Sequence, residues 1–283
     1  MDGTTSASAR ARSPHLGRQR QFQIMREFAP HNAIIPIVKG TQAKKISEVL
    51  GTGFFVRASG ELHVLTAKHV FQDSPLDKGE HYAYVVNTGP RIQVWTIPEF
   101  SFSNDFDVAI FKPRQFESAI ALPFSECQPS LNDDIICYEY SGTRIEKTRP
   151  NHTLVAFEPI AHKGNIMRSY ISDYPETKPT PSLIVSFPAM QGASGAPIIC
   201  ALGRKSFYVA GMVVANIERH LMPAQIVKMD DGVEKTSYFL PTAKAIDAVV
   251  IRNVITEMGF DLEYVKPNPI RQWASKLARR LGR

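Results

Sequence analysis

Residues 191–197 of the 283-residue chain read Gln-Gly-Ala-Ser-Gly-Ala-Pro, and this stretch decides how the rest of the sequence is interpreted. Short apolar segments flank it on both sides, so Ser194 is predicted to lie on a tight turn between two strands. Gly192 and Gly195 permit such a turn, because glycine adopts backbone angles that other residues avoid. A serine nucleophile needs this kind of backbone, which presents free N–H groups to a developing oxyanion. Taken alone, the stretch also fits an ordinary Gly/Ser turn of a β-protein.

Outside this stretch, the sequence consists mainly of short apolar runs separated by Gly, Pro, Asn and Asp. Many short strands with turn signals between them predict an all-β barrel or sandwich rather than alternating β–α–β units. The predicted strands are residues 34–38, 53–57, 62–67, 82–87, 91–97, 108–112, 135–140, 153–160, 183–187, 197–201, 207–215 and 238–240.

Two helices are predicted near the end of the sequence. The first covers about residues 242–258, with Thr242 as its N-cap and Gly259 just after its last residue. The second covers about residues 269–281 and combines an apolar stripe with charges that are all basic. Such a helix suits packing on the barrels, or binding to a membrane surface or a partner's groove.

Two further stretches contain the side chains that a serine nucleophile would need. His69 ends Thr-Ala-Lys-His at residues 66–69, after a strand whose hairpin is predicted to turn at residues 59–60. Asp107 begins Asp-Val-Ala-Ile, where an unpaired carboxylate would be costly to bury. Each has an ordinary alternative, a histidine that ends a strand and an aspartate in a solvated turn. Together they would supply a base that takes the serine proton and a carboxylate that orients this base.

The three stretches resemble, in the same order, those of the trypsin/chymotrypsin superfamily of serine peptidases. Residues 66–69 match the family's T-A-x-H, residues 107–110 match D-[IVL]-A-[LIV], and residues 192–197 match G-x-S-G-[GA]-P. The separations of 38 residues from His69 to Asp107 and 87 from Asp107 to Ser194 suit a compact member.

Three other segments support the resemblance. Gly-Thr-Gly-Phe-Phe-Val at residues 51–56 resembles the strand before the family's histidine, and Ala-Gly-Met-Val at 210–213 resembles the strand after its serine. Tyr-Phe-Leu-Pro-Thr at 238–242, followed by a helix, is similar to the stand-alone, HtrA-like bacterial branch.

The resemblance implies two antiparallel six-stranded β-barrels with C-terminal helices and a site in the cleft between the barrels. It implies that Ser194 is the nucleophile, His69 the general base and acid, and Asp107 the residue that orients the imidazole. The backbone N–H groups of Gly192 and Ser194 would form the oxyanion hole. The implied activity is that of a serine endopeptidase acting on proteins or peptides through an acyl-enzyme.

The predicted specificity pocket lacks a carboxylate. Pro188 stands six residues before Ser194, where members that select Lys or Arg have an aspartate. Ala189, Met190 and Val213 complete the predicted pocket, which favours cleavage after an apolar side chain.

Three positions depart from the family pattern. Ala193 replaces the acidic residue that pairs with a freed N-terminus in zymogen-activated members, so activation by N-terminal insertion is not expected. Val70 stands where secreted members have a disulfide cysteine. Val214 occupies the place of a serine that often supports the triad aspartate.

The net charge of +6 is concentrated at the two ends of the sequence. Residues 1–20 carry +3 and residues 266–283 carry +6, which leaves −3 for the remainder. The basic balance therefore does not predict specific nucleic-acid binding. Residues 1–21 are predicted to form a flexible basic tail. The other predicted parts are an N-terminal barrel over 22–125, a C-terminal barrel over 126–241, and helices with a basic tail over 242–283.

The sequence also predicts a compartment and partners. No apolar stretch is long enough for a membrane helix, and the first 25 residues lack the apolar core of a secretory signal. Cys127, Cys137 and Cys200 have neither disulfide-framework nor zinc spacing, which favours reduced thiols and a cytoplasmic location. No metal or cofactor ligand set is visible. The expected partners are a protein or peptide substrate, a separate regulatory protein, and a weak membrane-surface contact through residues 266–283.

Two other classes of protein compete with this interpretation. An α/β-hydrolase could use a similar serine elbow, but its acid and histidine follow the serine, whereas only His220 follows Ser194 here. A catalytically silent trypsin-like domain that acts as a protein-binding scaffold is the main alternative, because a fold does not guarantee a function.

Overall fold

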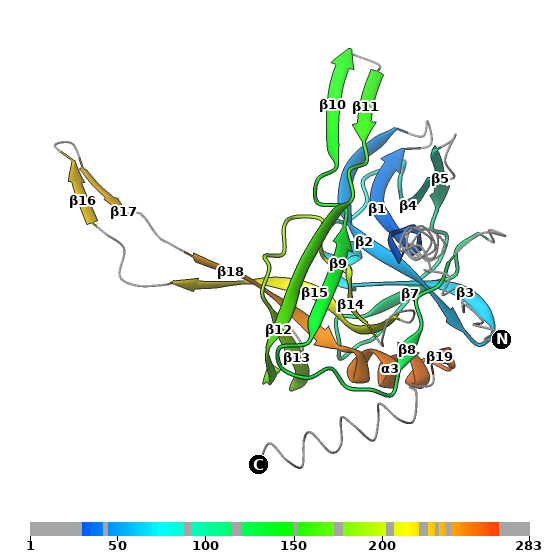
Figure 1. The fold of residues 1–283 in the computed structure, drawn as a ribbon. Coiled ribbons are helices and arrows are strands. Elements are labelled where there is room, and N and C mark those ends of the chain that lie inside the picture. Colours follow the sequence, from blue (N-terminus) through cyan, green and yellow to red (C-terminus); the bar gives the residue numbers. More distant parts are fainter. Residues whose placement is uncertain are drawn as a thin grey trace, which may run out of the picture. The chain divides into compact units, whose positions relative to one another are not determined.

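The computed structural model describes residues 30–41, 45–87, 92–114, 120–149, 152–172, 178–201, 207–220, 226–229, 232–235 and 239–265. The chain divides into two units, Met1–Pro30 and His31–Arg283, and the sheets discussed below belong to the second. The described elements are almost entirely β-strands, as the sequence predicts (Figure 1).

A seven-stranded antiparallel sheet forms the first half of the fold, in the order β5-β4-β1-β2-β3-β7-β6. The resemblance implies a closed six-stranded barrel here. Closure is less clear in this half than in the other, because the edge strands β5 and β6 are not hydrogen-bonded to each other within the described residues. The strands are β1 (Ile34–Thr41), β2 (Ile46–Ala58), β3 (Glu61–Thr66), β4 (Glu80–Asn87), β5 (Ile92–Thr96), β6 (Ser101–Phe102) and β7 (Ala109–Phe111).

A closed six-stranded antiparallel barrel forms the second half. Its order is β14-β9-β12-β13-β18-β15, and pairing of β14 with β15 closes the ring. Two short strands, β8 and β19, extend the same sheet from β15 through parallel pairings. The strands are β8 (Phe124–Ser125), β9 (Asp134–Glu139), β12 (Ile160–Ser172), β13 (Thr180–Val185), β14 (Pro197–Ala201), β15 (Phe207–His220), β18 (Phe239–Asp247) and β19 (Tyr264–Val265).

Two hairpins and three short helical segments complete the described elements. The hairpins are β10 (Arg144–Arg149) with β11 (His152–Ala156), and β16 (Ile226–Met229) with β17 (Gly232–Lys235). The helical segments are η1 (Pro30–Ala33), α2 (His69–Gln72) and α3 (Ala248–Glu257).

The helix predicted over residues 242–258 begins later than expected. Residues 242–247 belong to β18, where the side chains of Ala243 and Ala245 pack in the barrel core. The helix instead begins after Asp247, whose Oδ1 accepts a hydrogen bond from the Val249 N–H at 2.8 Å. Aspartate at this position satisfies an N–H group that has no partner within the helix.

Strand β14 connects the two hydrophobic cores because both of its faces are buried. Ile199 packs in the core of the first half with Phe54 and Leu65, whereas Ile198 packs in the barrel core with Leu183. A strand buried on both faces has a continuous apolar sequence rather than an alternating one. This arrangement anchors the segment that follows Ser194 between the two halves.

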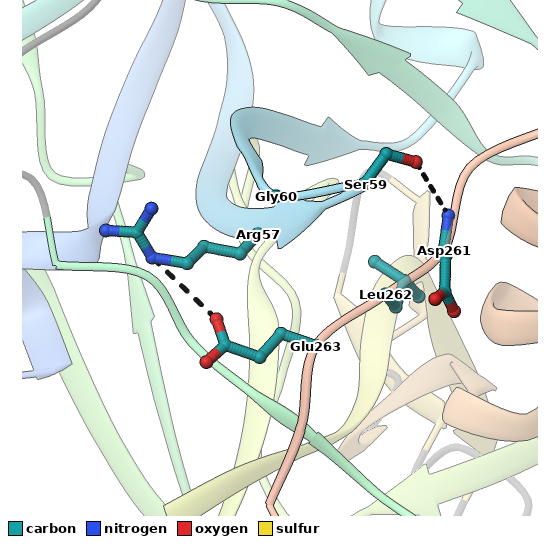
Figure 2. A pocket seen from close by; sticks show the side chains of 6 residues that line it. All are labelled: Arg57, Ser59, Gly60, Asp261, Leu262 and Glu263. Carbon is teal, nitrogen blue, oxygen red and sulfur yellow. Dashed lines mark hydrogen bonds and ion pairs between the residues drawn. The ribbon is translucent and has the colours of Figure 1, made fainter.

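The last described segment returns to the first sheet, at the turn between β2 and β3. Asp261 and Glu263 lie beside this turn, where the Ser59 hydroxyl accepts a hydrogen bond from the Asp261 N–H (Figure 2). A shallow pocket of about 410 Å³ lies there, and none of the predicted specificity residues lines it.

Several predictions fall on parts that the structure does not describe. The tail over residues 1–21, the helix over 269–281 and the basic segment over 266–283 lie outside the described residues. The domain limits at residues 125 and 241 stay predictions. Within the described residues, no helix is long and apolar enough to span a membrane.

Candidate active site

His69 begins α2, the single helical turn that follows β3. The next two side chains, Val70 and Phe71, are buried in the core of the first half and fix this turn in place. The His69 side chain itself is 27% exposed. The local structure therefore anchors the backbone around the histidine and leaves part of its ring accessible.

Asp107 binds His69 through both of its carboxylate oxygens. Oδ1 accepts a hydrogen bond from the His69 backbone N–H at 2.9 Å, and Oδ2 lies 2.6 Å from ring atom Nδ1. Asp107 itself is only 5% exposed. A buried carboxylate that accepts at Nδ1 fixes the tautomer in which Nε2 is free to accept a proton.

The surroundings of His69 stabilise its protonated form more than water does, so that its pKa is raised. Burial lowers the pKa of His69, but the hydrogen bond to Asp107 and the negative charges of Asp107 and Asp73 outweigh burial. The pKa of His69 is therefore raised above its ordinary value of 6.5. This shift strengthens the imidazole as a base.

Ser194 lies on a turn that is held mainly by backbone hydrogen bonds. The Ala193 N–H donates to the Met190 carbonyl at 2.9 Å, and the Gly195 N–H donates to the Val213 carbonyl at 2.8 Å. Gly192 and Gly195 have φ angles of +94° and +86°. These angles lie in the region that favours glycine, which explains both glycines of the stretch.

Two N–H groups of this turn have no partner in the described part of the chain. The N–H groups of Ala193, Gly195 and Ala196 each donate a hydrogen bond to a backbone carbonyl. Those of Gly192 and Ser194 donate none within the described residues. Unpaired N–H groups on either side of one residue are donors for an anionic oxygen.

The Ser194 turn packs directly against the strands that lead to His69. The Thr52 N–H donates to the Ser194 carbonyl at 2.8 Å. A Cβ atom on Gly195 would overlap the Thr52 carbonyl and the Thr66 hydroxyl, so only glycine fits there. No hydrogen bond joins the side chains of Ser194 and His69, which both belong to the described residues. Such bonds are often long before substrate binds.

The four predicted specificity residues differ in accessibility. Met190 is 54% exposed, Pro188 and Ala189 are half-buried, and Val213 is buried in the barrel core. Their role in a pocket stays a prediction. Ala193, Val70 and Val214, the three departures from the family pattern, are all buried.

The structure also contains a second histidine–carboxylate pair, which no sequence motif predicts. Glu139, at the end of β9, is completely buried, and its Oε1 lies 2.9 Å from His162 Nε2. The same oxygen accepts a hydrogen bond from the Ser141 hydroxyl at 2.6 Å, and the His162 ring stacks on Phe187. The only sequence signal was a glutamate at an inward position of an otherwise apolar strand.

The described residues contain no group of three or more His, Cys, Asp or Glu side chains that could hold a metal ion. All three cysteines are unpaired. Burial raises the pKa of Cys200 to about 12, so this thiol is not ionised at neutral pH.

Comparison with known families identifies the class of protein. The model of the trypsin-like peptidase domain family matches residues 51–209, which is more than half of the chain. The matched region contains His69, Asp107 and Ser194. The chain belongs to this family and is therefore a serine peptidase by class. No curated protein matches the chain.

Solved structures share the fold at low sequence identity. The active form of the Rv3671c protease from M. tuberculosis has a TM-score of 0.53 at 16% identity, covering 93% of this chain and 97% of that one. The MamO protease domain from Magnetospirillum magneticum has a TM-score of 0.52 at 14% identity, with coverages of 80% and 96%. A serine endoprotease from Yersinia pestis has a TM-score of 0.50 at 15% identity, with coverages of 84% and 66%. These similarities establish a chymotrypsin-like fold.

Proposed function

We propose that the chain is a serine endopeptidase with Ser194 as nucleophile, His69 as general base and acid, and Asp107 as the group that orients His69. The backbone N–H groups of Gly192 and Ser194 form the oxyanion hole. The observation that carries the proposal is the double contact of Asp107 with the backbone and ring of His69. This contact leaves Nε2 as the ring nitrogen that serves the nucleophile.

Acylation follows from these roles. Ser194 Oγ attacks the peptide carbonyl carbon while His69 Nε2 takes the hydroxyl proton. The negative charge that develops on the carbonyl oxygen is stabilised by the two N–H groups. The C–N bond then breaks, and His69 returns the proton to the leaving amine.

Deacylation repeats these steps with water. His69 takes a proton from water, whose oxygen attacks the ester carbonyl of the acyl-enzyme. The ester C–O bond breaks, the carboxylic acid product leaves, and Ser194 regains its proton from His69. No metal or organic cofactor enters this sequence of steps.

The proposal extends to specificity and surroundings. Pro188, Ala189, Met190 and Val213 supply no charge, which supports cleavage after apolar side chains. The three unpaired cysteines support a cytoplasmic location. A separate regulatory protein and a membrane contact through residues 266–283 are further proposals from the sequence.

The test is intact-mass measurement after incubation with a small fluorophosphonate, which reacts with an activated serine. We expect one adduct on the wild-type protein and none on Ser194→Ala or His69→Ala, with all three proteins folded by circular dichroism. Absence of labelling in a folded wild-type protein would contradict the proposal and would favour the protein-binding scaffold.

A further inference from the structure

Thr52 belongs to β2 but lies just beyond the end of its pairing with β3. That pairing runs from Ala58–Glu61 to Phe54–Leu65, so Thr52 lies two residues beyond its end. The Ser194 turn lies where β3 would otherwise have continued, because the Thr52 N–H donates to the Ser194 carbonyl. Thr52 is completely buried.

The Thr52 hydroxyl makes two hydrogen bonds, one as donor and one as acceptor. It donates to the Gly192 carbonyl at 2.7 Å and accepts from the Tyr140 N–H at 3.1 Å. Because a hydroxyl has only one proton to donate, the Tyr140 N–H directs that proton to Gly192. The Thr52 carbonyl in turn accepts from the Thr66 hydroxyl at 2.8 Å, which fixes the Thr52 backbone.

Thr52 therefore holds the carbonyls on both sides of Ala193. Its N–H binds the Ser194 carbonyl, and its hydroxyl binds the Gly192 carbonyl. These contacts lie next to the two N–H groups that are free to bind an oxyanion.

Gly192 needs such an external support. Glycine adopts positive and negative φ angles with similar ease, so its φ of +94° is not maintained by its own preference. The Thr52 hydroxyl and the Met190 carbonyl hold the peptide group between Gly192 and Ala193 from its two sides. Without the hydroxyl, the buried Gly192 carbonyl loses its donor and only the Met190 bond holds this peptide group, so the backbone angles of Gly192, which also orient its N–H, can change.

We infer that Thr52 is a positioning residue for the oxyanion hole, and that its hydroxyl keeps the Gly192 N–H aligned with the Ser194 N–H. The inference rests on the proposed function, because it assigns a support to the site proposed there. Within the described residues, Thr52 makes no hydrogen bond to His69, and its contacts act on the Ser194 turn.

The test compares Thr52→Val, which keeps the shape and removes the hydroxyl, with Thr52→Ser, which keeps the hydroxyl. Turnover of p-nitrophenyl acetate gives kcat and KM, and phenylboronic acid, which forms a tetrahedral adduct with an active serine, gives an affinity. We expect Thr52→Val to lower kcat about 10- to 100-fold with KM nearly unchanged, since misplaced oxyanion donors weaken the transition state. Affinity for phenylboronic acid should fall with kcat, and Thr52→Ser should restore both.

Thr180→Val is the matched control. Thr180 is equally buried, and its hydroxyl donates to the Lys178 carbonyl at 2.7 Å in β13. A loss of stability without a loss of kcat is expected there.

The outcomes separate the inference from the proposed function. If wild-type protein turns over the ester and Thr52→Val has the same kcat, the inference is overturned while the function stands. If wild-type protein is no more active than Ser194→Ala, the proposed function fails and the inference fails with it. If Thr52→Val does not fold, Thr52→Ala replaces it, and equal kcat for Thr52→Ala and Thr52→Ser would overturn the inference.

Discussion

The described residues contain two histidine–carboxylate pairs, one in each half of the fold, and their nitrogen–oxygen distances are similar. His69 and Asp107 approach to 2.6 Å, and His162 and Glu139 approach to 2.9 Å. The second carboxylate is the more buried of the two, with its side chain 0% exposed against 7% for Asp107. Distance and burial alone would therefore mark either pair as a candidate site.

The ring nitrogens and the surroundings distinguish the pairs. Asp107 binds Nδ1 of its histidine, so Nε2 is left for a substrate or nucleophile, whereas Glu139 binds Nε2 of His162. The His162 ring is stacked on Phe187, and Glu139 accepts its second hydrogen bond from the Ser141 hydroxyl, so within the described residues neither side chain of this pair is hydrogen-bonded to the Ser194 turn. In the described residues, the groups that surround a histidine–carboxylate pair therefore decide whether the pair is a candidate for catalysis.

The largest expected effect comes from Asp107→Asn. An amide at this position no longer favours the tautomer that serves Ser194, so kcat/KM should fall by about 10⁴-fold. Glu139→Gln is the matched change in the other pair and should leave kcat/KM within about threefold of wild type, because it touches no reacting group. Steady-state kinetics on p-nitrophenyl acetate checks both variants. Equal losses in the two would remove the distinction between the pairs.

His162→Ala should affect stability rather than catalysis. Removing one partner of a buried pair leaves Glu139 with the Ser141 hydroxyl alone, so the free energy of unfolding should fall by about 3 kcal/mol. Urea unfolding measures the loss, and fluorophosphonate labelling below the transition should proceed at the wild-type rate. His162→Gln, which retains a hydrogen-bond donor, should recover part of the stability. A variant that stays stable but is not labelled would assign His162 to the site.

The smallest expected effect is a shift in pH dependence. His69 acts as a base only when it is neutral, so labelling should increase as pH rises through its pKa, which lies above 6.5. Because the pKa is raised by folding, protonated His69 stabilises the folded state below pH 6.5, and this contribution is lost as pH rises through the folded value. Titration of His69 by NMR should give a lower pKa in Asp107→Asn, where burial remains and the charge is absent. An unchanged pKa would contradict the assigned cause.

The sequence predicts most strands because their apolar residues are locally visible. The strand over residues 197–201 has the same limits in the structure, and the hairpin turn at residues 59–60 is confirmed. The sequence does not predict most of strand β12, because its residues are mostly exposed or half-buried and show no clear alternation. The sequence predicts the helix N-cap at Thr242 rather than at Asp247, because strand pairing by residues 242–247 depends on distant partners.

The sequence predicts the three motifs of the candidate site but not the contacts that support them. The motifs predict that His69 and Asp107 act together, and the structure brings the two side chains into contact. Thr52 was part of a recognised segment, yet nothing local indicates that its hydroxyl reaches Gly192, 140 residues away. Glu139 and His162 meet only because β9 and β12 pair, which sequence periodicity does not reveal.

The return of the last described segment to the β2–β3 turn has a consequence for biosynthesis. Asp261 and Ser59, joined by a hydrogen bond, lie 202 residues apart (Figure 2). At translation speeds of about 5–20 residues per second, the turn leaves the ribosome about 10–40 s before its partner. The contact between the β2–β3 turn and this segment can therefore form only after the last described residues have been synthesised. The fold acquires its final contacts after translation has passed residue 261.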